Sequence, residues 1–361
     1  MAQSNAPRVL ISRLSHIGDC VLTLPLLTGL RRMFPQAHLA WCVESPTHKL
    51  IQHHPDLDQI ILVPKQWLKK PSAWRELSSQ IRGQFDIAID PQGITKSAMI
   101  CKLSKAKHRF GIKGRWGREF STILNNHLVK PVHPHLLDRT MEILAEISST
   151  MDPHRPYDGQ IHFGLPETDQ GQQLVHEFFG EQSFSSRPVV INPGASWESK
   201  RWETSRFGDV AKHLYRQHQL RSVITWAGPE EFEMATTIKE IAGDSAVVAP
   251  RTTLGELASL LHHSRFFIGC DTGPMHIATA MGAPCIGLHG TTLPTESGAY
   301  GPQNFAIQKW YQSGSCRQRR TASNDAMRDI AVSDVNQSVD QMVQRTVERS
   351  SVELKFGNIA A

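Results

Sequence analysis

The chain has 361 residues, of which 40% are hydrophobic and 20% charged, and its formal net charge is +5 at pH 7. This composition is typical of a soluble globular protein, and the length suggests two domains of roughly 150–180 residues each. No apolar run is long enough to span a membrane, and residues 1–7 contain no apolar signal-peptide stretch. We therefore expect a cytoplasmic protein that contacts the inner face of the cytoplasmic membrane peripherally at most.

Several classes of site are disfavoured by what the sequence lacks. The six cysteines are scattered without a C-x-x-C pair, which indicates reduced packing residues. The adjacent histidine pairs 53–54 and 262–263 lack the i, i+4 spacing that places two metal ligands on one helix face. No G-x-G-x-x-G loop, P-loop or nucleic-acid-reading module is visible. We expect no cofactor, no metal and no nucleic acid partner.

The first half of the chain alternates short apolar stretches with amphipathic ones. The pattern predicts strands over 8–13, 38–44 and 85–90, and helices over 20–34, 71–83, 95–105 and 136–149. Such alternation is typical of a mostly parallel, doubly wound sheet. Asp19 follows the first strand, at the start of a helix whose dipole would keep its carboxylate ionised. It is either a general base or only a helix cap.

The stretch from Lys96 to Arg118 contains no acidic residue. Either it forms a solvated face, or it faces an anionic partner such as a phosphorylated acceptor, a membrane surface or nucleic acid. Its basic residues are Lys96, Lys102, Lys105, Lys107, Arg109, Lys113, Arg115 and Arg118.

The amino-acid composition changes near residues 150–168. This segment is rich in proline, glycine and polar residues, which indicates a linker. The alternation then restarts. It predicts strands over 188–192, 222–226, 246–249 and 284–289, and helices over 205–217, 231–242, 254–263 and 333–348. We expect a first domain over 1–160, a second over 161–332, and a C-terminal helix and tail over 333–361 that could pack back on the first domain.

Residues 265–282 predict a strand, a tight loop and a helix that begins at the carboxyl edge of the second sheet. Asp271 and Thr272 are N-cap residue types, and Pro274 suits the first helical position. A helix N-terminus in this place suits a phosphate group, and Gly273 would let a ligand approach the backbone. The alternative is an ordinary strand-to-helix turn with an aspartate cap.

Other residues of the second half could also bind a nucleotide. Lys200 offers a positive charge to a phosphate and Ser196 a hydroxyl, unless Lys200 is merely solvated. Glu231 could accept hydrogen bonds from ribose hydroxyls, or only benefit from the helix dipole. His276 lies one turn into the helix and could donate to a phosphate or simply pack.

Taken together, five stretches resemble the ADP-heptose–lipopolysaccharide heptosyltransferases, glycosyltransferase family 9, and they occur in that family's order. The resemblance implies a GT-B fold, in which two Rossmann-like domains face a cleft, with the sugar nucleotide bound mainly in the second domain and the acceptor in the first. The stretches are Ser15–Asp19 with Thr23–Pro25, Asp90–Gly93 with Lys96–Ser97, Asn192–Ala195 with Lys200–Trp202, Ala227–Glu231, and Asp271–His276.

The resemblance also implies a reaction. A heptose would pass, with inversion, from a nucleotide-diphosphate donor such as ADP-heptose to an anionic lipid-linked acceptor of the lipid A–Kdo type. Asp19 would be the general base, and Lys200 would bind the pyrophosphate and stabilise the leaving group without a metal. The donor site would comprise Ser196, Lys200, Glu231, Asp271, Thr272, Gly273 and His276. The acceptor site is predicted from the charges of the first half and not from the resemblance, above all from the stretch without acidic residues. It would comprise Lys69, Lys70, Gln92, Lys96, Arg118 and Arg139.

Two departures from the family pattern leave the identity of donor and acceptor open. A second hydroxyl that is frequent in the 192–202 loop is Ala195 here, and a cysteine-rich segment near the C-terminus is reduced to Cys316. Two other functions also remain open, a GT-B-like sugar-nucleotide epimerase and a non-catalytic nucleotide- or polyanion-binding protein. The basic stretch argues against the epimerase, which needs no acceptor surface. The sequence leaves open the sugar, the base, the acceptor hydroxyl, whether the first or the second heptose is transferred, and the oligomeric state.

Overall fold

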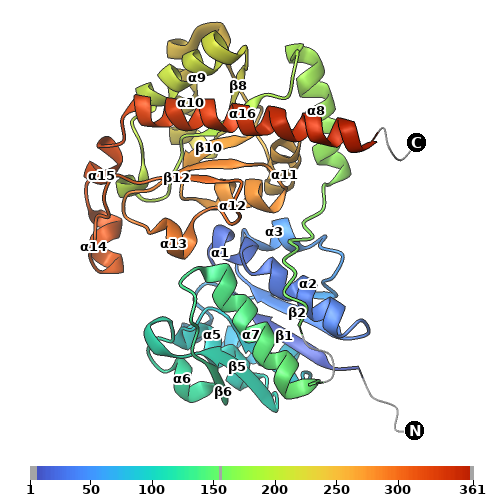
Figure 1. Cartoon of the computed structure of the whole chain (residues 1–361). Helices are drawn as coiled ribbons and strands as arrows, with labels where there is room; N and C mark the ends of the chain where they lie inside the picture. The colour runs from blue at the N-terminus through green and yellow to red at the C-terminus, as the bar shows by residue number, and fades with distance from the viewer. Residues whose placement is uncertain (1–5, 154–156, 358–361) are drawn as a thin grey trace. The chain divides into compact units, whose positions relative to one another are not determined.

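The computed structural model describes residues 6–153 and 157–357, with side chains described as far as residue 346. The middle of the expected linker, 154–156, and the end of the expected tail, 358–361, lie outside the described residues. The chain divides into two units, Met1–Pro166 and Glu167–Ala361 (Figure 1). Within the described ranges, no helix combines the length and the apolar character needed to cross a membrane.

The first unit is built on a sheet of parallel strands in the order β3-β2-β1-β4-β5-β6. The strands β2 and β3 follow β1 on one side, and β5 and β6 follow β4 on the other. The connections that leave β1 and β4 therefore run in opposite directions. Open α/β sheets bind ligands at such a switch point, beyond the carboxyl ends of the strands. The strands are β1 Arg8–Ser12, β2 His38–Val43, β3 Gln59–Leu62, β4 Ile87–Asp90, β5 His108–Ile112 and β6 His127–Val129.

Helices cover both faces of this sheet. On one face, α4 (Pro71–Ile81) and α5 (Thr95–Leu103) pack with the strand residues Leu10, Ala40 and Ala88 in one apolar core. On the other, α2 (Leu24–Met33) packs against α7 (Leu136–Met151), as Figure 1 shows. These two helices approach closely, since a Cβ on Gly29 would lie 2.3 Å from a methyl carbon of Leu144.

The expected single helix over 20–34 is wrong, because the structure has two helices there, α1 (Ile17–Val21) and α2. Pro25 lacks an N–H group and cannot continue the hydrogen-bond ladder of α1. The Thr23 hydroxyl donates instead to the carbonyl oxygen of Asp19, at 2.8 Å. The break lets α1 remain a short segment next to the end of β1.

The second unit repeats the same topology, in the order β12-β11-β10-β7-β8-β9, again with parallel strands only. Its switch point therefore lies between β7 and β10, which pair directly. The strands are β7 Val189–Asn192, β8 Ser222–Ile224, β9 Ala246–Val248, β10 Phe267–Cys270, β11 Cys285–Leu288 and β12 Phe305–Ile307.

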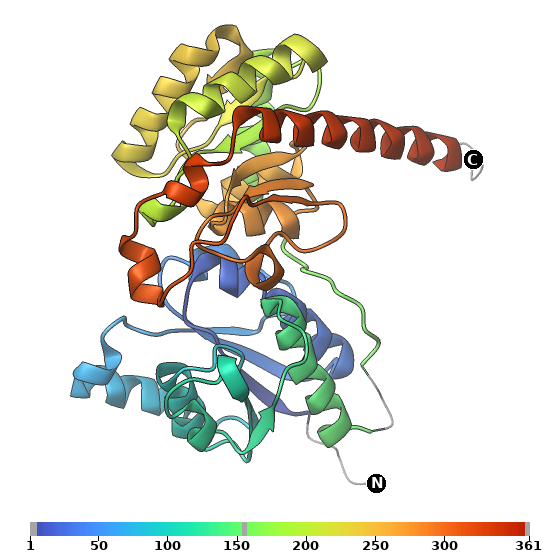
Figure 2. The same cartoon turned by 60° about the vertical axis from the view of Figure 1, so that its left-hand side comes forward.

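The larger core of this unit lies between its sheet and the helices α9 (Thr204–His218), α10 (Gly228–Ala242) and α16 (Val332–Gly357). Packed together elsewhere in the unit are α8 (Asp169–Gln182), α11 (Leu254–His262) and α12 (Gly273–Ala280). The described buried side chains of α16, including Val335, Val339 and Met342, belong to the core of the second unit. Figure 2 shows α16 lying along that unit, and packing on the first domain stays a prediction.

Apart from the single helix over 20–34, the expected strands and helices are present with shifted ends, but several elements were missed, including the helix α8. The strands β3, β5 and β6 are short and contain polar residues, and β12 has only three residues, so the apolar pattern of these four strands is weak. The remaining helices are α3 His48–Ile51, α6 Ser121–Leu124, α13 Pro294–Ser297, α14 Cys316–Thr321 and α15 Asp325–Arg328, with 3₁₀ turns at Trp67–Lys69, Gly114–Trp116, Glu198–Lys200 and Gly243–Ser245.

Candidate active site

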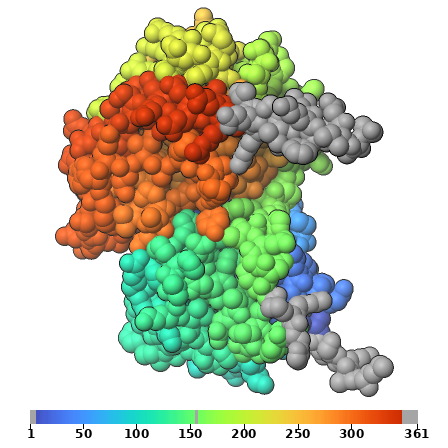
Figure 3. Space-filling model, viewed as in Figure 1, coloured from blue at the N-terminus to red at the C-terminus, as the bar shows by residue number. Residues whose placement is uncertain are grey.

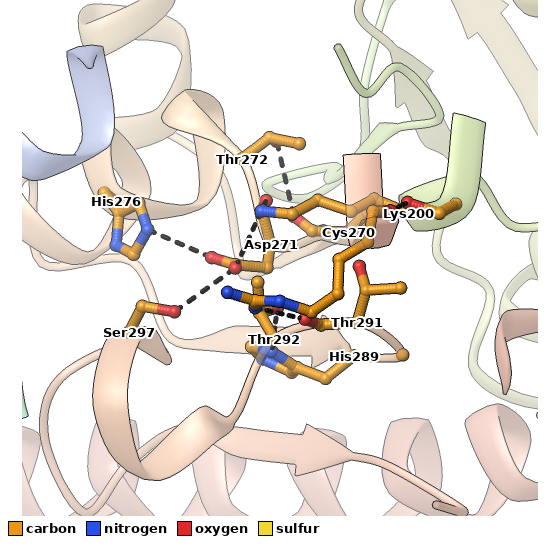
Figure 4. A network of polar contacts seen from close by, with 12 residues as sticks. Lys200, Cys270, Asp271, Thr272, His276, His289, Thr291, Thr292 and Ser297 are labelled. Carbon is orange, nitrogen blue, oxygen red and sulfur yellow. Dashed lines mark hydrogen bonds and ion pairs between the residues drawn. The ribbon is translucent and has the colours of Figure 1, made fainter. Parts of the chain in front are cut away.

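Lys200 and Asp271 meet at the switch point of the second sheet. Lys200 ends the 3₁₀ turn that follows β7, and Asp271 directly follows the neighbouring strand β10. The Lys200 ammonium donates to the Asp271 carboxylate and to the Asp271 carbonyl oxygen, each at 3.0 Å, as Figure 4 shows. The ammonium also lies 4.8 Å from the centre of the Trp197 ring. A cation is thereby fixed at the carboxyl edge of the sheet.

The Asp271 carboxylate is buried and accepts hydrogen bonds on both oxygens. His276 Nε2 lies 3.3 Å from Oδ1, and the Ser297 hydroxyl donates to Oδ2 at 3.3 Å (Figure 4). Burial acts to raise the pKa of Asp271, but Lys200, the His276 hydrogen bond and His289 together hold that pKa well below its usual value. Asp271 is therefore an anion that orients the cation of Lys200.

The helix α12 begins at Gly273 without a side-chain cap among the described residues. Thr272 occupies the N-cap position, yet its hydroxyl donates to the carbonyl oxygen of Cys270 and does not accept a helix N–H group. The expected capping by Asp271 or Thr272 is therefore wrong, because the Asp271 side chain is bound to Lys200. Pro274 lies in the first turn, as expected. The first-turn N–H groups are left for an anion from outside the helix.

Buried polar atoms without a described partner surround the same position. They are Nδ1 of His276, Nε2 of His289 and the hydroxyl of Thr291. Burial lowers the pKa of His289 to about 4, so its ring is neutral at pH 7. Buried polar groups are nearly always hydrogen-bonded, so such a cluster indicates a place where a polar ligand or water completes the bonding.

Glu231 lies against the loop that carries Lys200. Its carboxylate accepts the N–H group of Ala227 at 2.7 Å, and burial raises its pKa. A Cβ added to Gly194 would lie 2.2 Å from the Glu231 carboxyl group, so only a glycine allows this approach. Ser196 is exposed two residues further along the same loop. The structure thus brings Ser196, Lys200 and Glu231 to one end of the second sheet.

Asp19 forms an ion pair with Arg13 in the first unit. The distance between Arg13 Nη2 and Asp19 Oδ2 is 2.6 Å, and the two side chains are 4% and 35% exposed. Asp19 is the third residue of α1 and caps no helix, since His16 is at the N-cap position. The sequence predicted that the carboxylate interacts with the dipole of the helix. In the structure its ion-pair partner is the buried guanidinium of Arg13. The Asp19 side chain thus keeps a solvent-exposed part beside the buried guanidinium.

The connections after β1 and β4 are tied together at this switch point. Arg13 Nη1 donates to the carbonyl oxygen of Pro91 at 3.1 Å, and the amide oxygen of Gln92 accepts the N–H group of Leu14 at 3.0 Å. Gln92, expected at the acceptor site, therefore supports the loop that leads to Asp19. Buried Asp90 holds the same connection, and burial raises its pKa to about 6 despite hydrogen bonds from Ser97, Gly93 and Asn125.

All the expected acceptor residues follow carboxyl ends of strands in the first sheet. Of these, Lys69, Lys70 and Arg118 are exposed. Lys96 forms an ion pair with Glu44, and Arg139 donates to the carbonyl oxygen of Pro134 and lies 4.6 Å from the Trp116 ring. Lys69 and Lys70 follow β3, Gln92 and Lys96 follow β4, Arg118 follows β5, and Arg139 follows β6.

The basic stretch 96–118 does not form a single face, because α5 returns the chain to the opposite edge of the sheet before β5 begins. Lys102 lies in the last turn of α5, and Lys105 and Lys107 lie between the end of α5 and the start of β5, at that opposite edge. Arg109 lies on β5 itself, and its guanidinium donates to the carbonyl oxygens of Ala106 and Leu124. Only the ends of the stretch, near 96 and 113–118, belong to the carboxyl edge.

Several residues that contact the candidate site residues or their loops were not predicted from the sequence. They are Arg13 and Glu44 in the first unit, and His289, Ser297 and Arg319 in the second, where Arg319 donates to the carbonyl oxygen of Thr291 at 2.7 Å. Arg13 and Glu44 were signalled only by being charged residues directly after buried strands. Ser297 and Arg319 lie far from Asp271 in sequence, and no local pattern links them to it.

Comparison with known proteins assigns residues 74–327 to the family described as "Glycosyltransferase family 9 (heptosyltransferase)". The chain is 26% identical over 324 residues to the protein named lipopolysaccharide heptosyltransferase 1 of Pseudomonas aeruginosa, covering 86% of each chain. It is 22% identical to lipopolysaccharide heptosyltransferase 3 of Escherichia coli, covering 93% of this chain and 99% of that protein.

Solved structures have the same fold. A family 9 glycosyltransferase of Veillonella parvula superposes with a TM-score of 0.74 at 21% identity, covering 94% of this chain and 97% of that one. The Escherichia coli heptosyltransferase WaaC with ADP superposes with a TM-score of 0.73 at 21% identity, covering 93% and 99%. The two Rossmann-like units are therefore those of a GT-B fold, as expected.

Proposed function

The chain belongs to glycosyltransferase family 9, and on that premise we propose that it transfers a heptose from ADP-heptose to the inner core of lipopolysaccharide, with inversion at the anomeric carbon. The observation that carries this proposal is the Lys200–Asp271 pair beside the uncapped N-terminus of α12. It offers a fixed cation and free N–H groups at one switch point, which is the chemistry that a nucleoside diphosphate requires.

The donor would bind to the second domain, residues 161–332. The diphosphate would accept hydrogen bonds from Lys200 and from the first turn of α12, at Gly273. Charge that develops on the departing diphosphate would be stabilised by the same groups, which are already in place before the reaction. Glu231, beside the glycine of the Lys200 loop, would accept hydrogen bonds from the ribose hydroxyls.

The acceptor would bind to the first domain, residues 1–160, with Asp19 as general base. Its carboxylate would take the proton from an acceptor hydroxyl while that oxygen attacks the anomeric carbon, and the bond to the diphosphate breaks. Arg13 would fix one carboxylate oxygen of Asp19, so that the other faces the acceptor. Arg13 is in this proposal a positioning residue.

The acceptor would be anionic and lipid-linked, of the lipid A–Kdo type. The exposed cations that follow carboxyl ends of strands, among them Lys69, Lys70 and Arg118, would bind its negative charges. We expect the enzyme to contact the cytoplasmic face of the membrane peripherally while it works. The reaction would need no metal, because Lys200 and the α12 N-terminus supply the positive charge.

The test is a transfer assay with purified full-length protein, ADP-heptose and a lipid A–Kdo acceptor, followed by mass spectrometry of the acceptor. The expected result is an acceptor heavier by one heptose, formed only when both substrates are present and undiminished by EDTA. UDP-glucose and GDP-mannose in place of ADP-heptose serve as controls for the donor. Conversion of the sugar nucleotide into an epimer without transfer, or binding without turnover, would overturn the proposal.

A further inference from the structure

Two histidines and an aspartate meet on the second unit, away from the loops of the candidate active site. His213 Nε2 and His218 Nε2 lie 2.8 Å and 2.7 Å from the same atom, Oδ1 of Asp340. Their side chains are 20%, 20% and 45% exposed. We call these residues the His–Asp cluster. It joins α9, which carries both histidines, to α16, which carries the aspartate.

The three possible ligand atoms lie close enough together to share one metal ion. They all lie within 4.8 Å of one another. The two imidazole rings have centroids 5.8 Å apart and an interplanar angle of 72°. Two imidazoles bound to one zinc ion, with Zn–N bonds of about 2.0–2.1 Å, place their ring centroids roughly 5–6 Å apart. The observed rings therefore need only a small shift to share an ion.

The helices that carry these ligands are held in place by packing. Val210, Ala211 and Leu214 of α9 and Val339 of α16 are buried in one core beneath the cluster. Figure 3 shows the described part of α16, in red, lying against the yellow-green segments of the same unit. Ligands on packed helices are positioned before the ion arrives, which favours binding.

We propose that the His–Asp cluster binds a divalent transition-metal ion of the zinc class and ties α16 to α9. Two imidazole nitrogens and one carboxylate oxygen suit Zn²⁺, Co²⁺ or Ni²⁺, whereas Mg²⁺ and Ca²⁺ require a shell of oxygen atoms. The half-exposed Asp340 leaves room for water as a further ligand. The ion would be structural, because its ligands lie on α9 and α16 and not on the loops that carry Lys200 and Asp271.

One other group of this kind occurs among the described residues, formed by Glu167, His262 and His263. It is less well arranged, since His262 Nε2 is 3.7 Å from Glu167 and the side chain of His262 is 47% exposed. His262 and His263 are adjacent in sequence, and their rings do not converge on one oxygen atom as closely as those of the His–Asp cluster. This second group supplies the comparison that the experiment needs.

The experiment measures Zn²⁺ binding to metal-stripped full-length protein by calorimetry, Co²⁺ binding by visible absorption, and the melting temperature with and without Zn²⁺. We expect about one ion per chain, a visible Co²⁺ spectrum typical of nitrogen and oxygen ligands, and a higher melting temperature with Zn²⁺ but not with Mg²⁺. Asp340→Asn, which keeps the size and an acceptor oxygen, should weaken Zn²⁺ binding at least tenfold. His218→Gln should have a similar effect.

Two variants serve as matched controls. Asp209→Asn changes an exposed carboxylate on α9, the helix that carries both histidines, and His176→Gln changes an exposed histidine on α8. Both should bind Zn²⁺ as the wild type does. The proposal is overturned if the wild type binds no Zn²⁺, if His218→Gln and Asp340→Asn bind it unchanged, or if binding disappears in His262→Ala/His263→Ala instead. If Asp340→Asn fails to fold, as circular dichroism would reveal, His218→Gln decides between these outcomes.

Discussion

Lys200 and Asp271 form a largely buried ion pair across neighbouring strand ends, 3.0 Å apart and 71 residues apart in sequence. Their side chains are 15% and 5% exposed. Each residue depends on the other, because a buried charge without its partner is costly. The same pair that offers a cation to a phosphate therefore also contributes to the stability of the second unit.

Lys200→Met should lose nucleotide affinity and stability together. The lost phosphate contact is worth about 1.5–3 kcal/mol, and the unpaired Asp271 carboxylate costs up to about 3–5 kcal/mol of unfolding free energy. Calorimetry with ADP and urea unfolding measure the two effects. In Lys200→Met/Asp271→Asn, stability should recover while ADP affinity stays low. Recovery of both would show that Lys200 does not contact the nucleotide.

Gly194→Ala should displace the Glu231 carboxylate, which lies where the new Cβ must go. The hydrogen bond to Ala227 would break, lowering the unfolding free energy by about 1 kcal/mol, and ADP should bind several-fold more weakly if Glu231 contacts the ribose. Gly180→Ala is the matched control, because the same added Cβ meets no atom within 4 Å. Equal ADP affinity in the two variants would remove Glu231 from the proposed donor site.

His289 predicts a specific loss of stability in mild acid. Burial lowers its pKa from 6.5 to about 4, so between these values the unfolded chain binds a proton that the folded chain does not. Stability therefore falls as the pH falls through that window, by up to about 3 kcal/mol for this group. Urea unfolding at several pH values gives the unfolding free energy as a function of pH. Between pH 6.5 and pH 4 this free energy should fall less steeply for His289→Gln than for the wild type. If the substitution leaves this pH dependence unchanged, His289 is not the group whose lowered pKa causes the loss of stability.

Variants of Arg118 and Lys102 can show which edge of the first sheet binds the acceptor. Both are exposed members of the basic stretch, but Arg118 follows the carboxyl end of β5 and Lys102 lies near the opposite edge. Arg118→Ala should raise the KM for an anionic acceptor several-fold and reduce its salt dependence, because a charge pair at the surface is screened by ions. Lys102→Ala should change neither. Similar effects of both variants would indicate diffuse attraction and no acceptor site at this edge.

The placement of the site loops could be predicted from the sequence, because apolar strands are followed by short loops of Gly, Pro, Asp and Ser. That pattern located Asp19, Lys200 and Asp271 beyond carboxyl ends of strands, where the structure has them. The partners of these residues could not be predicted. The bonds Arg13–Asp19 and Lys200–Asp271 depend on how the loops bend, and a local pattern carries no information about that.

The basic stretch shows a second limit. Its charges are continuous along the sequence, but β5 passes through it, and a strand carries the chain across the sheet from one edge to the other. The strand was missed because only Phe110 and Ile112 mark its buried side. Charge along a sequence predicts a charged face only when the secondary structure of the segment is known.

Asp19→Asn tests the proposed general base, and the structure changes what else should be expected of it. A sugar hydroxyl is a poor nucleophile at neutral pH, so loss of the base should lower turnover by roughly 10²–10⁴-fold while ADP binding stays normal. The substitution also removes the anionic partner of Arg13, whose side chain is only 4% exposed. We therefore expect a lower melting temperature as well, unlike a change at a simple helix cap.

The two consequences of Asp19→Asn can be separated with a second variant. Arg13→Met/Asp19→Asn leaves no buried charge unpaired, so stability should return part of the way toward the wild-type value, since the bond from Arg13 to the Pro91 carbonyl oxygen is also lost. Turnover should stay as low as in Asp19→Asn, because neither variant has a base. Urea unfolding and the heptose-transfer assay measure these quantities. If turnover instead recovered together with stability, Asp19 would act only by pairing with Arg13, and the proton would have to be taken by another group.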